Sequence, residues 1–154
     1  MIDYAHTPES LESILSAVKS YTRGRVICVF GCGGNRDKNK RPLMGEISGR
    51  ISDYTIITSD NPRNEEPKEI INEIEEGIKK TKACYKVIVD RKEAIKNAIE
   101  MANKLDIVVI AGKGHEMYQE INGNKLEFNE RKIVIEITDE LKKKQEEKYT
   151  NKKK

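Results

Sequence analysis

The segment Asp60-Asn61-Pro62-Arg63 carries side chains that could bind a charged ligand. It follows residues 54–58, whose β-branched side chains predict a strand, and it precedes a helix that Pro67 is expected to open. In an open α/β sheet, ligands bind beyond the carboxyl ends of the strands, where this segment would lie. The planar guanidinium of Arg63 suits bidentate binding of a carboxylate or a phosphate. A loop arginine on its own more commonly bridges a surface acid or caps a helix, so this alternative stays open.

A glycine-rich loop, Gly31-Cys32-Gly33-Gly34, follows another predicted strand. Glycines let the backbone turn tightly there and approach a ligand closely. The loop is not a dinucleotide fingerprint, which would need glycine in place of Arg36, and the phosphate loop G-x-x-x-x-G-K-S/T is absent from the sequence. Cationic side chains follow the glycines at Arg36, Lys38, Lys40 and Arg41. This pattern predicts either an anion-binding loop or a plain turn with solvated charges.

Two further segments combine polar side chains with loop positions. They are Asp3-Tyr4-Ala5-His6-Thr7-Pro8 and Ala111-Gly112-Lys113-Gly114-His115-Glu116. Taken alone, His6 is expected to be a helix-entry residue bonded to the backbone. Lys113 would be a solvated loop lysine, and His115 a structural histidine.

Strand and helix signals alternate along the chain. Apolar residues at helical spacing predict helices at residues 10–21, 42–51, 67–80, 92–104 and 130–141. Short apolar or β-branched runs predict strands at residues 25–30, 54–58, 86–89 and 107–111. Residues 117–121 and 125–128 flank Asn122-Gly123-Asn124, which predicts a β-hairpin. We therefore expect a doubly wound, Rossmann-like α/β domain with a mainly parallel sheet, helices on both faces and an added β-hairpin.

Taken together and in this order, the four segments resemble the C-terminal domain of the Mur ligases. Within that family they are most similar to the branch that adds diaminopimelate. The resemblance runs over residues 2–141, and the expected strands and helices join the four segments.

The resemblance implies a binding site for meso-diaminopimelate. Its residues would be Arg36, Asp60, Asn61, Pro62, Arg63, Gly112 and Glu116. Diaminopimelate has a carboxylate and an ammonium group at each end, so Arg63 would bind the distal carboxylate and Glu116 the distal ammonium. Lysine lacks that carboxylate and the lysine-adding relatives lack this arginine, which favours diaminopimelate.

The same resemblance implies nucleotide contacts from Asp3 and His6, with Lys113 and His115 in supporting roles. It implies a ligase that uses ATP and Mg²⁺ to join diaminopimelate to UDP-MurNAc-dipeptide. In the family the phosphate loop, the magnesium ligands and the catalytic residues belong to a central domain. We therefore expect no catalytic or metal-binding residue here, and a separated C-terminal domain that is inactive alone. The alternatives are the same domain of a lysine-adding ligase or a folylpolyglutamate synthetase, or a stand-alone module that binds an amino acid or nucleotide.

Composition limits the other classes of function. The 154 residues carry a net charge of +3 and a mean hydropathy of -0.71, which fits one soluble domain. Nothing resembles a signal peptide, and no apolar run approaches the ~20 residues of a membrane span, so we expect a cytoplasmic protein without a membrane partner. Three cysteines without metal-ligand spacing fit a reducing compartment. We expect a domain at residues 1–141 and a lysine-rich, disordered tail at 142–154, which lacks the aromatic residues that would favour nucleic acid.

Overall fold

The computed structural model describes residues 1–151, in which strands and helices alternate as far as the fifth strand. The strands are β1 Ile2–Asp3, β2 Val26–Phe30, β3 Tyr54–Ile57, β4 Tyr85–Val87, β5 Ile107–Ala111, β6 Tyr118–Ile121 and β7 Asn124–Glu127. The helices are α1 Pro8–Tyr21, α2 Lys40–Ile51, α3 Pro67–Ile78, α4 Arg91–Met101 and α5 Glu130–Asn151.

The first five strands form one parallel sheet in the order β1-β5-β2-β3-β4. Strand β2 is central, and all five of its residues are buried, because helices cover both of its faces. Ile27 and Val29 face one helical layer, while Val26, Cys28 and Phe30 face the other. The predicted doubly wound fold with a parallel sheet is confirmed.

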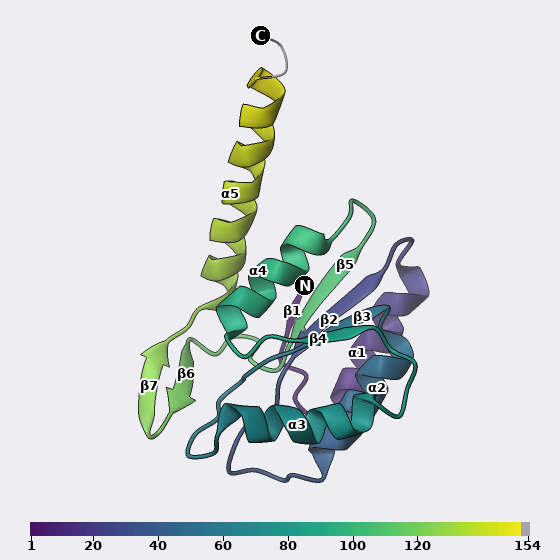
Figure 1. Ribbon diagram of the computed structural model, residues 1–154, viewed down its shortest axis with the longest axis vertical. Coiled ribbons are helices and arrows are strands. Elements are labelled where there is room, and N and C mark those ends of the chain that lie inside the picture. Colours follow the sequence, from purple (N-terminus) through teal and green to yellow (C-terminus); the bar gives the residue numbers. More distant parts are fainter. Residues whose placement is uncertain (152–154) are drawn as a thin grey trace.

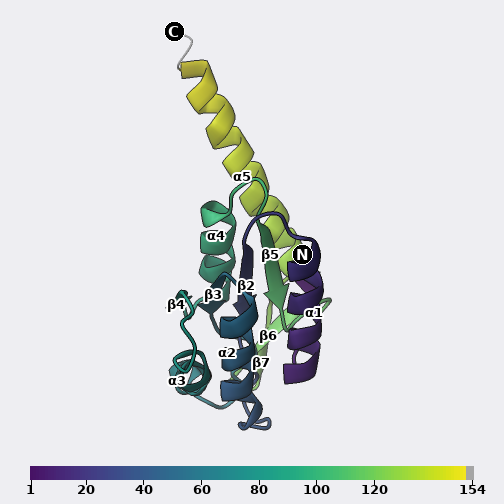
Figure 2. The ribbon, with the colours of Figure 1, turned by 90° about the vertical axis from the view of Figure 1, so that its right-hand side faces the viewer.

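The helices lie in two layers, which Figure 1 shows on either side of the sheet; Figure 2 shows the same ribbon turned by 90°. Helices α1, α2 and α3 pack on one face of the sheet through an apolar cluster that includes Leu15, Met44 and Ile74. Helices α4 and α5 cover the other face through residues such as Ile95 and Ile133. With both faces covered, the loops at the carboxyl ends of the strands are the natural place for a ligand.

Strands β6 and β7 form a separate antiparallel hairpin, as the sequence predicts. Its turn residues Asn122 and Gly123 have φ angles of 49° and 77°. Positive φ at both positions is the geometry that favours Asn-Gly in two-residue hairpins. The hairpin contacts the main body where Ile121 forms a bridge with Arg63, so it lies against one of the candidate binding segments.

Two features differ from the sequence prediction. The edge strand β1 was not predicted, because two residues are too short to give a periodic signal. Helix α5 continues through Asn151, which is further than the fraying helix end and disordered terminus expected of residues 142–154. Lys, Glu and Gln are good helix formers, so the helix extends past its last buried residue, Ile137, and projects from the body in Figure 1. Residues 152–154 lie outside the described residues.

Candidate functional site

A cleft of about 470 Å³ opens at the carboxyl ends of the parallel strands. The loops that follow β1, β2, β3 and β5 line it, together with Tyr118 of the hairpin. The lining includes these residues expected from the sequence: His6, Arg36, Asp60, Asn61, Arg63, Gly112 and Glu116. The other expected residues, which lie outside the lining, are Asp3, Pro62, Lys113 and His115. The cleft therefore unites all four candidate segments.

Asn61 connects three parts of this cleft. Its Oδ1 accepts hydrogen bonds from Lys113 Nζ at 2.6 Å and from the backbone N of Glu120 at 3.0 Å. Its Nδ2 donates to Glu116 Oε2 at 3.1 Å. Because only 4% of Asn61 is exposed, these bonds are sheltered from water and fix the direction of the amide. Pro62, the next residue, stiffens the same turn.

Lys113 is fully buried, although a loop lysine on its own is expected to be solvated. Its Nζ lies 2.6 Å from Asn61 Oδ1 and 2.8 Å from the carbonyl oxygen of Tyr118. Asp60 Oδ1 and Glu116 Oε2 each lie 3.3 Å from the same atom. Four oxygens therefore offset the desolvation of the ammonium. Sequence reasoning missed this burial because two of the four partners, Asp60 and Asn61, come from a distant segment.

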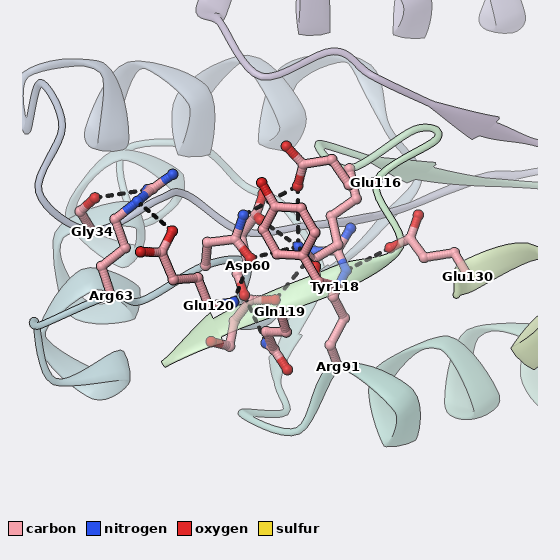
Figure 3. A network of polar contacts seen from close by, with 12 residues as sticks. Gly34, Asp60, Arg63, Arg91, Glu116, Tyr118, Gln119, Glu120 and Glu130 are labelled. Atoms are coloured by element: carbon pink, nitrogen blue, oxygen red, sulfur yellow. Dashed lines mark hydrogen bonds and ion pairs between the residues drawn. The ribbon is translucent and has the colours of Figure 1, made fainter. Parts of the chain in front are cut away.

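Arg63 lies at the opposite side of Asp60 from Glu116 (Figure 3). Its Nη1 donates to the carbonyl of Gly34 at 2.9 Å, and its Nε lies 3.2 Å from Glu120 Oε2. The guanidinium thus bridges an acid, which was the alternative from the sequence, yet it also lines the cleft. The backbone of Arg63 has a φ of 51°, and it is held there by hydrogen bonds to the hairpin.

The hairpin contacts the turn at Asp60 to Arg63 in a way that sequence reasoning did not assign. Gln119 Nε2 donates to the carbonyl of Asp60 at 2.6 Å, and the backbone N of Arg63 donates to the carbonyl of Glu120 at 3.0 Å. Strand β6 therefore braces the turn at Asp60 to Arg63 along its length (Figure 3). The Asn-Gly signal identified the hairpin, but no local pattern indicates which loop a hairpin packs against.

Two features favour glycine at position 112. Its φ of 116° is a conformation that other residues rarely adopt. A Cβ atom at this position would also lie 2.7 Å from Asp60 Oδ2. The absence of a side chain lets the end of β5 approach the buried turn, which brings Glu116 and Lys113 to Asn61.

The glycine loop after β2 is fixed by a buried arginine. Arg41 is fully buried, in contrast to the solvated loop charge that the sequence allowed. Its Nη2 donates to the carbonyl of Gly33 at 3.1 Å and to Glu65 Oε1 at 3.0 Å, and its Nη1 donates to Glu73 Oε2 at 2.7 Å. The loop is thereby tied to α3 and to the segment that precedes it, while Arg36 remains exposed at the cleft.

Acid should weaken the attachment of this loop. The hydrogen bonds from Arg41 lower the pKa of Glu65 from its ordinary value of 4.5 to about 2. The unfolded chain therefore takes up the proton first as the pH falls, so stability should fall between about pH 4.5 and pH 2. Urea unfolding at a series of pH values measures this slope. Glu65→Gln should flatten it, whereas Glu100→Gln, which changes an exposed carboxylate on α4, should not; equal slopes for both variants would contradict the assignment.

The candidate nucleotide residues lie at the start of the chain. Asp3 Oδ1 accepts a hydrogen bond from the backbone N of Ala5 at 2.8 Å, and His6 Nδ1 lies 2.8 Å from the carbonyl of Tyr4. His6 therefore has the backbone contact expected of a helix-entry residue, and it also lines the cleft. The ring of Tyr4 lies 4.6 Å from that of His6 and 5.5 Å from that of His115.

A buried ion pair lies beneath the cleft and was not predicted. Arg91 Nε donates to Glu130 Oε1 at 2.6 Å, and both side chains are inaccessible to solvent (Figure 3). Arg91 also donates to the carbonyls of Ser59 at 3.2 Å and Ala111 at 2.8 Å. These carbonyls directly precede Asp60 and Gly112, so the arginine fixes the points at which two cleft loops leave the sheet.

Within residues 1–151, no group of three or more His, Cys, Asp or Glu side chains is arranged to hold a metal ion. The sequence also lacks a phosphate loop of the type G-x-x-x-x-G-K-S/T. None of the described helices combines the length and apolarity needed to cross a membrane.

Comparison with known proteins places these observations in a family. The family model described as "Mur ligase, glutamate ligase domain" matches residues 1–114. The UDP-N-acetylmuramoyl-L-alanyl-D-glutamate--2,6-diaminopimelate ligase of Caldanaerobacter subterraneus subsp. tengcongensis is 58% identical over 142 residues, which are 92% of this chain and 30% of that relative. The chain thus spans about a third of the length of the curated relatives it matches.

Solved structures agree with the sequence comparison. A structure of a UDP-N-acetylmuramoyl-L-alanyl-D-glutamate--2,6-diaminopimelate ligase superposes with a TM-score of 0.87 at 45% identity, over 91% of this chain and 29% of that one. Escherichia coli FolC in complex with ADP has a TM-score of 0.53 at 19% identity, over 72% of this chain and 25% of that one. The second likeness reflects a shared fold alone.

Proposed function

The chain belongs to the Mur ligase family, whose glutamate ligase domain it carries, and from this premise we propose that it is the amino-acid-binding domain of a diaminopimelate ligase. The complete enzyme would join meso-diaminopimelate to UDP-MurNAc-L-Ala-D-Glu in peptidoglycan synthesis, in the cytoplasm. The names of the relatives at 58% and 54% identity support this substrate. The folylpolyglutamate alternative has only the shared fold in its favour.

The observation that carries the proposal is the charge pattern of the cleft. Arg63 lies on one side of Asp60, and Glu116 lies on the other (Figure 3). A ligand that carries both a carboxylate and an ammonium group can pair with both residues at once. Diaminopimelate has such a pair at each end, so one end can be bound here while the amine of the other end is presented for reaction.

The chemistry of the bond itself would belong to other parts of the enzyme. ATP and Mg²⁺ activate the glutamate carboxylate in this reaction, and the cleft has neither a phosphate loop nor a metal-binding cluster within the described residues. This domain would bind and orient the amino acid, and it would be inactive alone. Asp3 and His6 would contact the nucleotide from the edge of the domain, with His115 beside them.

Ligand titration tests the proposal on the chain as it stands. We expect meso-diaminopimelate to shift the ¹⁵N–¹H NMR resonances of residues in the cleft. L-lysine should bind at least about 10-fold more weakly, because it lacks the carboxylate that would form charge-assisted hydrogen bonds with Arg63. Equal affinities for the two amino acids would contradict the assignment of substrate.

A further inference from the structure

Lys113 is a fully buried cation in contact with cleft residues, and the proposed reaction gives it no direct role. It lies beneath the cleft and does not line it. An ammonium group has three N–H donors, and Lys113 Nζ has four oxygens around it, from Asn61, Tyr118, Asp60 and Glu116. The position of this one group therefore affects three separate segments of the binding site.

The first consequence concerns the amide of Asn61. Its Oδ1 accepts from both Lys113 Nζ and the backbone N of Glu120. A reversed amide would place an NH₂ group against these two donors, so the reversed orientation is strongly disfavoured. Lys113 thereby directs Asn61 Nδ2 toward Glu116.

The second consequence concerns the carboxylate of Glu116. Asn61 Nδ2 and Lys113 Nζ both contact the same oxygen, Oε2, at 3.1 Å and 3.3 Å. Within residues 1–151, Oε1 has no recorded hydrogen-bond partner, and Glu116 lines the cleft. One oxygen is thus held by the protein, and the other is available to a ligand.

We infer that Lys113 is a positioning residue that sets Asn61 and Glu116 to receive the second ammonium group of the bound amino acid. The inference rests on the proposed function. It goes beyond the charge pattern, because Lys113 acts here by orienting Glu116, which in turn binds the ammonium group of the ligand.

A purely electrostatic role makes the opposite prediction. Removing a positive charge next to Asp60 and Glu116 makes this side of the cleft more negative, which alone would strengthen the binding of an ammonium group. Loss of positioning would weaken that binding, because Asn61 and Glu116 would lose their fixed directions. The direction of the change in affinity therefore separates the two roles.

The experiment compares two ligands in the Lys113→Met variant. Meso-diaminopimelate has the second ammonium group, and 2-aminopimelate lacks it while retaining both carboxylates. We expect the dissociation constant for diaminopimelate to rise at least about 10-fold and that for 2-aminopimelate to change by less than about 3-fold, as measured by NMR titration. Lys86→Met, which removes an exposed lysine from β4, is the matched control and should bind as the wild type does.

Each other outcome contradicts the inference. Lys113 does not position Glu116 if the variant binds diaminopimelate more tightly than the wild type does. The same holds if its preference between the two ligands is unchanged, or if its affinity for both ligands falls equally. A wild-type chain that binds diaminopimelate well in the same titration keeps the proposed function intact in these cases. A wild-type chain that binds neither ligand would remove the proposed function and the inference together.

A second measurement on the wild type does not depend on the folding of the variant. Buried, hydrogen-bonded ammonium groups exchange slowly with water, so the ¹⁵Nζ resonance of Lys113 should be observable. We expect diaminopimelate to shift this resonance and 2-aminopimelate to leave it in place. The same shift with both ligands would overturn the inference.

Discussion

Replacing Arg63 with alanine is expected to lower kcat/KM for diaminopimelate by about 30- to 1,000-fold, or roughly 2–4 kcal/mol. The side chain of Arg63 is only 20% exposed, and the variant would remove a charge-assisted, bidentate contact with the ligand carboxylate. The assay requires a complete ligase that carries this chain as its C-terminal domain. The KM for ATP should change little, because Arg63 is proposed to bind the amino acid and not the nucleotide.

Three controls separate ligand binding from structural damage by Arg63→Ala. Arg63→Lys should also be poor, because an ammonium group cannot reproduce the planar fork. Arg23→Ala removes an exposed arginine outside the lining of the cleft and should leave kcat/KM unchanged. Because Arg63 also pairs with Glu120, the substitution should be repeated in a Glu120→Gln background. If the loss disappeared there, it would reflect the unpaired Glu120 and not a lost ligand contact.

The sequence predicted the fold well because its signals are local and repeated. The apolar run at β2 indicated a strand buried on both faces, and every residue of it is buried. Asn122-Gly123 predicted a two-residue hairpin turn, and the positive φ angles of both residues agree. Each of these signals is complete within a few residues. The two-residue strand β1 carries no such signal and was missed.

The site was predicted in part, because its residue types are local but their partners are distant. The four segments were recognised, and one cleft contains residues from all of them. The sequence gives no sign that Lys113 is buried, since its burial depends on Asn61, 52 positions away. The same holds for the contact of Gln119 with Asp60, 59 positions away. Such pairs depend on how the loops and the hairpin pack against one another. Secondary-structure propensity and residue spacing carry no information on that packing.

Helix α5 is longer than the sequence predicted. Residues 142–154 were expected to form a fraying helix end and a disordered terminus because they lack apolar side chains, and that argument concerned packing alone. The helix that contains residues 142–151 is already nucleated by residues 130–141, which pack on the sheet through Ile133 and Ile137. Extending an existing helix with Lys, Glu and Gln has little cost, so helical structure continues beyond the core.

Replacing Arg91 with methionine is expected to lower the free energy of unfolding by about 3–5 kcal/mol, because it leaves the carboxylate of Glu130 buried without a partner. Both side chains of this pair are inaccessible to solvent, and Arg91 Nε lies 2.6 Å from Glu130 Oε1. The carbonyls of Ser59 and Ala111 would lose hydrogen bonds as well. Urea unfolding of the chain, followed by circular dichroism, measures the change.

The double variant Arg91→Met/Glu130→Met distinguishes an unpaired charge from a general loss of packing. Removing both charges leaves no buried ion to desolvate, so the double variant should be more stable than Arg91→Met alone. It should remain less stable than the wild type, because the carbonyls of Ser59 and Ala111 still lack a donor. Arg131→Met, on the exposed face next to Glu130, should change stability by less than about 0.5 kcal/mol. A double variant that is as unstable as the sum of its single variants would show that the two side chains act independently, and the ion pair would then not be what holds α4, α5 and the cleft loops together.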